Sequence, residues 1–177
     1  MSLTARSGKE QRRTVALLGG FCLFLSTIEY MIPKPLPFMR IGLANAPLLI
    51  ALDIVSFKYF VLLTLIKLFG QAIITGTLFS YVFLFSLVGT WVSAGFMYLL
   101  RRTLSPKRIS FIGISLIGAF FSNGSQLALA RFFIFGEGIR FLIPPFLGAG
   151  IVTGMTLGLF CETFAAGSRW YKARLAL

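Results

Sequence analysis

Few side chains in this sequence of 177 residues could carry out covalent or metal-dependent chemistry. Histidine is absent, which excludes catalysis by an imidazole base and removes the commonest transition-metal ligand. The acidic residues are dispersed along the chain, at Glu10, Glu29, Asp53, Glu137 and Glu162. Chemistry on diphosphates with Mg²⁺ needs clustered carboxylates. We therefore predict that the chain is not an enzyme and that it holds no cofactor or metal ion.

Polar side chains inside long apolar runs are the first candidates for ligand contact. Lys67 lies near the middle of one such run, and Gln71 follows one helical turn later on the same face. An ionisable or amide group within a membrane is costly, so it is a functional candidate by default. We predict that Lys67 and Gln71 contact a substrate. The alternative is that Lys67 pairs with Asp53.

A second polar group lies in SNGSQ, residues 122–126. Asn123 and Gln126 place two amides beside small residues in an otherwise apolar run. A ligand pocket needs a few such donors and acceptors in apolar surroundings. We predict that both amides contact the ligand, although amides also form hydrogen bonds between helices. Arg131, at the end of this run, suits either a carboxylate or phosphate of the ligand or a lipid headgroup.

Arg40 and Asn45 flank the start of another apolar run. A helix N-terminus offers free N–H groups and partial positive charge, so Arg40 beside it would complete an anion site. Glu29 could orient Arg40, or the two could simply shape the loop. The predicted substrate-binding residues are Arg40, Asn45, Lys67, Gln71, Asn123, Gln126 and Arg131. They favour an anionic or amide-rich ligand.

The composition, 57% hydrophobic and 12% charged, excludes an ordinary soluble protein. Six apolar runs are long enough for membrane helices, at 14–32, 41–57, 59–79, 81–100, 109–130 and 146–166. Pro47 lies inside the second run and should kink it. We predict an all-α integral membrane protein with six transmembrane helices in one domain, residues 14–166. Basic tails, 1–13 and 167–177, flank this domain.

The net charge of +12 is best explained by membrane topology and contact with anionic lipid, not by nucleic acid. Both tails are basic, as is the loop 101–108. The positive-inside rule then places both termini in the cytoplasm, which requires an even number of spans.

Small residues recur at four-residue spacing in two of the predicted helices. They are Ala16 and Gly20 in the first, and Gly150, Gly154 and Gly158 in the last. Such ridges let helices approach closely. They could pack inside this protein or against a partner membrane subunit.

An ordered series of motifs resembles one membrane family. RIGLAN (40–45), IKLFGQAIITGTLFS (66–80) and ISLIGAFFSNGSQLALAR (114–131) are similar to heptaprenyl diphosphate synthase component I, also called the Gx transporter family. This family groups with the substrate-binding S components of energy-coupling factor (ECF) transporters. The resemblance spans roughly residues 14–166. Where the family pattern has His-Asn, this chain has Ser122-Asn123, which keeps the amide and lacks the imidazole.

The resemblance implies a six-helix, S-component-like fold with a pocket open to the outside and capped by the proline-rich loop 32–40. In ECF systems a small-residue ridge on the first helix docks a coupling membrane subunit, and Ala16 and Gly20 match that ridge in type. Cytoplasmic ATPases would supply the energy. This chain has no GxxxxGK[ST] motif, so it is not the ATPase itself.

Three functions remain open at this point. We expect a substrate-binding subunit in the cell membrane of a prokaryote, for uptake of a small molecule such as a vitamin or cofactor precursor. The alternative is a non-catalytic membrane partner in isoprenoid or quinone metabolism. A third possibility, a purely structural subunit, predicts that SNGSQ packs against other helices and leaves no cavity.

Overall fold

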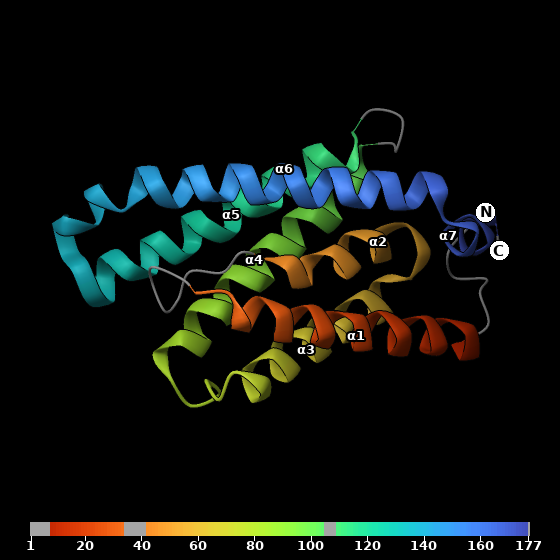
Figure 1. The fold of residues 1–177 in the computed structure, drawn as a ribbon, viewed down its shortest axis with the longest axis horizontal. Coiled ribbons are helices and arrows are strands. Elements are labelled where there is room, and N and C mark those ends of the chain that lie inside the picture. Colours follow the sequence, from red (N-terminus) through yellow and green to blue (C-terminus); the bar gives the residue numbers. More distant parts are fainter. Residues whose placement is uncertain (1–7, 34–41, 105–108, 177) are drawn as a thin grey trace.

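The computed structural model describes residues 8–33, 42–104 and 109–176, and no strand occurs among them. The long helices are α1 (Gly8–Met31), α3 (Phe57–Ile74), α4 (Tyr81–Thr103), α5 (Phe111–Ala130) and α6 (Ile143–Gly167). The shorter ones are η2 (Leu43–Asn45), α2 (Ala46–Ile54), η3 (Arg131–Phe135), η4 (Gly136–Phe141) and α7 (Arg169–Ala176). The chain is therefore all-α (Figure 1).

Five helical segments in the described residues are long and apolar enough to cross a membrane. They are Gly8–Met31, Phe57–Ile74, Tyr81–Thr103, Phe111–Phe141 and Ile143–Gly167. Large apolar side chains on them face outward, with Phe24 59% and Ile73 68% exposed. Outward apolar surface of this extent suits contact with lipid. These features identify an all-α membrane protein.

The second predicted span is the element that differs most from expectation. It is a single turn, η2, followed by α2 of nine residues, which is about 14 Å long and too short to cross a bilayer of about 30 Å by itself. The end of α2 nevertheless lies at the same end of the molecule as α7, since Asp53 bonds Tyr171, so the two ends of the chain stay on one side. Pro47 stands in the first turn of α2, where its missing N–H does no harm, so it starts the helix and does not kink one. Every residue of α2 except Asp53 is buried, so α2 is a core helix.

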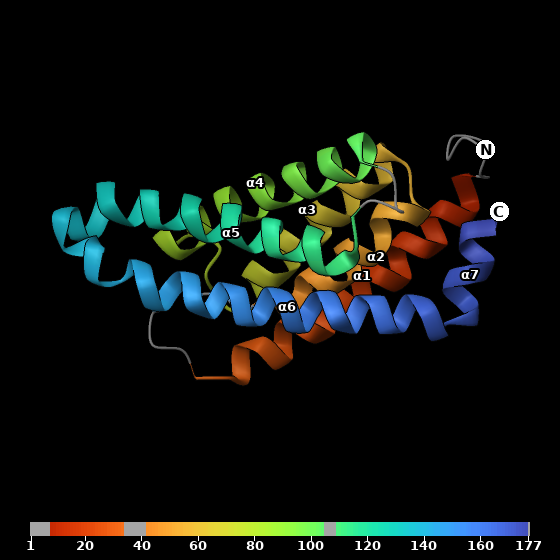
Figure 2. The same cartoon turned by 90° about the horizontal axis from the view of Figure 1, so that it is seen from above.

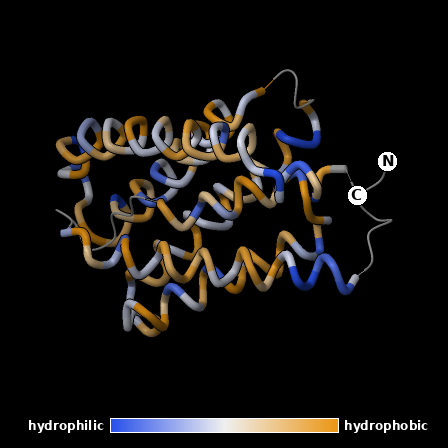
Figure 3. The backbone as a smooth tube through the Cα atoms, turned by 45° about the vertical axis from the view of Figure 1, so that its right-hand side comes forward, coloured by the Kyte–Doolittle hydropathy of each residue, from blue (hydrophilic) through white to orange (hydrophobic). Residues whose placement is uncertain are grey.

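The two ends of the described chain also differ from the predicted tails. The first helix begins at Gly8, so residues 8–13 belong to it, and the basic C-terminal segment forms α7. Arg174 of α7 lies 3.9 Å from the Glu10 carboxylate, which places both ends together. Hydrophilic residues are concentrated at this end of the molecule (Figure 3).

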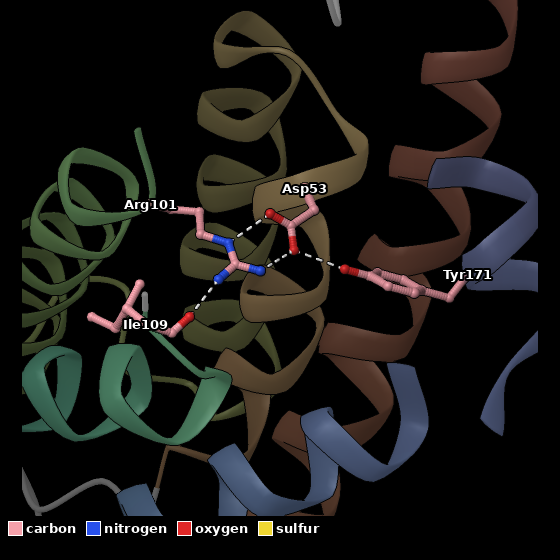
Figure 4. A network of polar contacts seen from close by, with 4 residues as sticks. All are labelled: Asp53, Arg101, Ile109 and Tyr171. Carbon is pink, nitrogen blue, oxygen red and sulfur yellow. Dashed lines mark hydrogen bonds and ion pairs between the residues drawn. The ribbon is translucent and has the colours of Figure 1, made fainter. Parts of the chain in front are cut away.

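A polar network fixes α2, α4 and α7 to one another near that end (Figure 4). The Arg101 guanidinium donates from Nε and Nη2 to the two carboxylate oxygens of Asp53, at 2.7 and 2.6 Å. The Tyr171 hydroxyl donates to the same carboxylate at 2.8 Å. Asp53 therefore pairs with Arg101, and the alternative pairing with Lys67 is not found.

The glycine ridge of α6 packs inside the molecule. A Cβ at Gly158 would overlap the backbone of Ile112 on α5, and one at Gly154 would press on Leu116. Close approach of these two helices therefore depends on glycine. Figures 1 and 2 show α5 and α6 side by side, with the end that joins them projecting beyond the rest of the bundle. Ala16 and Gly20 are exposed on α1.

Candidate functional site

A polar cavity of about 40 Å³ lies inside the bundle, between α1, η2, α3, α4, α5 and α6. Its lining residues are Glu29, Gly42, Ala44, Asn45, Lys67, Gln71, Ser86, Thr90, Ala119, Ser122, Asn123, Gln126 and Thr153. Six elements thus each contribute residues to the lining of one cavity. A purely structural subunit was expected to leave no cavity beside SNGSQ, and the cavity is present.

Lys67 anchors one wall of the polar cavity. Its side chain is 4% exposed, and the ammonium donates to Asn45 Oδ1 at 2.9 Å and to Thr90 Oγ1 at 3.1 Å. A buried cation needs such acceptors, because desolvation without them is costly. The lysine therefore ties the start of α2 to the middle of α3 and α4.

Glu29 closes the cavity on the α1 side. It is 1% exposed, and its Oε2 accepts a hydrogen bond from the Gly42 backbone N–H at 3.1 Å. Gly42 has φ +87°, a left-handed conformation that favours glycine and turns the chain into η2. This turn brings Asn45 back toward Lys67.

Two glutamine side chains in the cavity each have an amide oxygen without a hydrogen-bond partner. Oε1 of Gln71 and Oε1 of Gln126 are buried and accept no hydrogen bond, although Gln126 Nε2 donates to Ser122 Oγ at 3.1 Å. Leaving such a group unpaired costs about 1–3 kcal/mol. A bound group that donates hydrogen bonds would remove this cost.

Glycines on the neighbouring helices make room for these amides. A Cβ at Gly89 on α4 would come within 2.6 Å of Gln126 Nε2, and a Cβ at Gly150 on α6 would overlap the Asn123 amide. Asn123 Nδ2 donates to the Phe146 carbonyl at 3.1 Å. Asn123 thus makes the inter-helix hydrogen bond that was the alternative to ligand contact, and it also lines the cavity.

The structure brings five of the predicted substrate-binding residues to this cavity: Asn45, Lys67, Gln71, Asn123 and Gln126. Their contact with a substrate stays a prediction. Arg131 lies elsewhere, in the projecting end of the α5–α6 pair, where its exposed guanidinium contacts Glu137 at 2.6 Å. Arg40 falls outside the described residues.

Sequence reasoning did not select several lining residues, including Glu29, Ser86 and Thr90. Ser86 and Thr90 carried a usable signal, since they stand one helical turn apart, with Gly89 between them. Glu29 was considered only as a partner for Arg40. A carboxylate at the end of an apolar run is usually expected at the membrane surface, so the sequence does not reveal that Glu29 is buried.

An apolar groove adjoins the polar cavity on the lipid-facing side of α6. It has a volume of about 290 Å³. Its lining residues are Leu25, Leu43, Ala46, Val152, Thr153, Thr156, Leu157 and Phe160. Thr153 belongs to both linings, so the polar cavity and the apolar groove lie next to each other at this residue. Val152 and Phe160, 65% and 47% exposed, lie at the open side of the groove.

The family comparison agrees with this membrane architecture. The family model described as heptaprenyl diphosphate synthase component I matches residues 18–164, which is most of the chain. No curated protein gives a significant match, and neither does any solved structure. Residues 1–17 and 165–177 lie outside the match.

Proposed function

The chain belongs to the heptaprenyl diphosphate synthase component I family, and from that premise we propose that it is a non-catalytic membrane component of isoprenoid metabolism that binds an isoprenoid within its bundle. The observation that carries this proposal is that Thr153 lines both the polar cavity and the apolar groove. A polar cavity beside an apolar groove fits a molecule with a polar head and a hydrocarbon chain. Isoprenoid lipids have this form.

The apolar groove would position the ligand's hydrocarbon chain and contribute little to the binding affinity. Lipid tails are as apolar as its lining, so moving a chain from the bilayer into the groove gains little hydrophobic free energy. Contacts of the head in the polar cavity must then supply most of the affinity. The hydrocarbon chain of the ligand, held in the groove, would direct the head toward Thr153.

The absence of catalysis is part of the proposal. Among the described residues, no three His, Cys, Asp or Glu side chains gather in one place. Ionising an allylic diphosphate needs Mg²⁺ held by clustered carboxylates. A component of this family would leave that step to a partner subunit and hold or present the lipid.

The alternative is capture of a small water-soluble molecule for uptake with a coupling subunit and ATPases. The polar cavity alone favours it, because such a molecule needs placed donors and acceptors and no groove. Both proposals place the protein in the cell membrane of a prokaryote with its basic ends in the cytoplasm. They differ in whether the ligand also occupies the apolar groove.

Filling the groove tests the proposal. The substitution Thr156→Trp puts a large side chain into the groove, whereas Thr163→Trp makes the same change at an exposed position of α6 outside its lining. We expect Thr156→Trp to weaken binding of tritiated geranylgeraniol or geranylgeranyl diphosphate in nanodiscs by about tenfold or more. Thr163→Trp should bind like the wild type.

Two results would contradict the proposal. One is that wild-type protein binds neither probe. The other is that native mass spectrometry finds a water-soluble metabolite whose retention is the same in wild type and Thr156→Trp, which would establish the uptake alternative.

A further inference from the structure

The polar cavity is a poor fit for a diphosphate. Among the described residues that line it, Lys67 is the only cation, and its ammonium already donates to Asn45 and Thr90. Glu29 adds a carboxylate to the same lining. Diphosphate sites gather several cations or metal ions around their negative charge. Here the described lining holds one cation and one carboxylate.

The unpaired atoms of the cavity are acceptors. Oε1 of Gln71 and Oε1 of Gln126 need donors, and a fully ionised diphosphate has none to offer. A hydroxyl does have one. The two glutamines are 2% and 3% exposed, so bulk water does not serve them directly.

The volume admits such a group. The cavity measures about 40 Å³, which exceeds the roughly 10–15 Å³ that one water needs on the same measure, so a hydroxyl fits inside it. The apolar groove of about 290 Å³ leaves the space for the hydrocarbon part.

From acceptor chemistry and charge together, in a cavity that a hydroxyl fits, we infer that the head held in the polar cavity is a neutral hydroxyl at the end of an isoprenoid chain. This inference rests on the proposed function and narrows its ligand. A prenyl alcohol and a prenylated quinol share this chemistry. The hydroxyl would donate to Gln71 or Gln126, and the chain would leave past Thr153 into the groove.

The decisive comparison uses three ligands and the wild-type protein. Geranylgeraniol carries the donor, its methyl ether keeps the oxygen and lacks the donor, and geranylgeranyl diphosphate carries the charge. In nanodiscs of neutral lipid, we expect the alcohol to bind about tenfold tighter than the ether, the factor that one hydrogen bond typically gives. The diphosphate should bind more weakly than the alcohol.

Variants then locate the donor's partner. Gln126→Leu and Gln71→Leu remove one acceptor each, and Ser125→Ala alters the same helix at a residue that does not line the cavity. The alcohol should lose its advantage over the ether in a glutamine variant and keep it in Ser125→Ala. Because the ligand comparison uses wild-type chain, it decides the matter even if a glutamine variant does not fold.

The outcomes separate this inference from the proposed function. Tighter binding of the diphosphate than of the alcohol, or equal binding of alcohol and ether, would overturn the hydroxyl head while leaving an isoprenoid site. Failure of all three ligands to bind would overturn both. Displacement of bound geranylgeraniol by a short-chain ubiquinol at lower concentration than by unlabelled geranylgeraniol would assign the hydroxyl to a quinol.

Discussion

At the scale of single residues, the site combines polar side chains that have hydrogen-bond partners with others that have an atom without one. Lys67 has acceptors within the protein, whereas Gln71 and Gln126 each keep a buried oxygen unpaired. A buried acceptor without a partner is costly, so these two oxygens favour a ligand that donates hydrogen bonds. In our proposal the amides recognise the ligand, whereas Lys67 links Asn45 and Thr90 in the cavity wall.

Those amides and the lysine were predictable because polar side chains stand out in apolar runs. The hydroxyls were not. Ser26 and Thr64 donate to the carbonyl four residues earlier in their own helices, while the Thr90 hydroxyl accepts from Lys67. The sequence pattern cannot separate these two uses, because Ser and Thr in helices commonly bond their own backbone.

Gly89 gives a residue-level prediction with a matched control on the same helix. Replacing Gly89 with alanine puts a Cβ within 2.6 Å of Gln126 Nε2 and displaces that side chain from the cavity wall. We expect Gly89→Ala to weaken isoprenoid binding by about tenfold, measured in nanodiscs. Gly95→Ala meets nothing within 4 Å and should bind like the wild type. Equal effects of the two substitutions would mean that Gln126 does not recognise the ligand.

At the scale of helices, apolar pattern alone identified where the chain turns helical but not which helices cross the membrane. The run 41–57 is as apolar as the others, yet it forms the short α2 in the core. A buried helix and a spanning helix both lack a polar face, so periodicity cannot distinguish them. Pro47 was the available signal, since proline is favoured at the start of a helix and disfavoured inside one.

The docking of α7 makes a prediction at the same scale. Tyr171 is 6% exposed, and burial together with the neighbouring Asp53 raises the pKa of its hydroxyl above the usual value of about 10. The folded protein thus favours the protonated hydroxyl, which donates to Asp53. Its contribution to stability is complete below about pH 10 and is lost as pH rises through the folded pKa.

We therefore expect Tyr171→Phe to lower the free energy of unfolding by about 1–3 kcal/mol, because the lost hydrogen bond has a charged acceptor. The loss, followed as a change in Tm in detergent, should be the same at about pH 6 and pH 9. Tyr59→Phe, which removes a long, exposed hydrogen bond to the Gly8 carbonyl, should cost less. A loss for Tyr171→Phe that fades between these pH values would contradict the raised pKa.

At the scale of the whole molecule, polarity is divided between one end and the interior. The charged start of α1 and α7 lie together at one end, and the joined end of α5 and α6 lies at the other (Figure 1). Basic residues at the first end favour a cytoplasmic location for it. The polar cavity lies within the bundle, and the apolar groove beside it is lined by residues of α1, η2, α2 and α6.

This arrangement predicts opposite sides of the membrane for two surface positions. Gly138 lies in η4, at the far end of the segment Phe111–Phe141, and Lys172 lies in α7, so α6 is the spanning helix between them. The native Cys22 and Cys161 are both 0% exposed, so wild-type protein should give little background with a membrane-impermeant maleimide. We expect Gly138→Cys to be labelled on intact cells and Lys172→Cys only after permeabilisation. The reverse pattern would invert the topology, and labelling of both positions from one side would mean that α6 does not span the membrane.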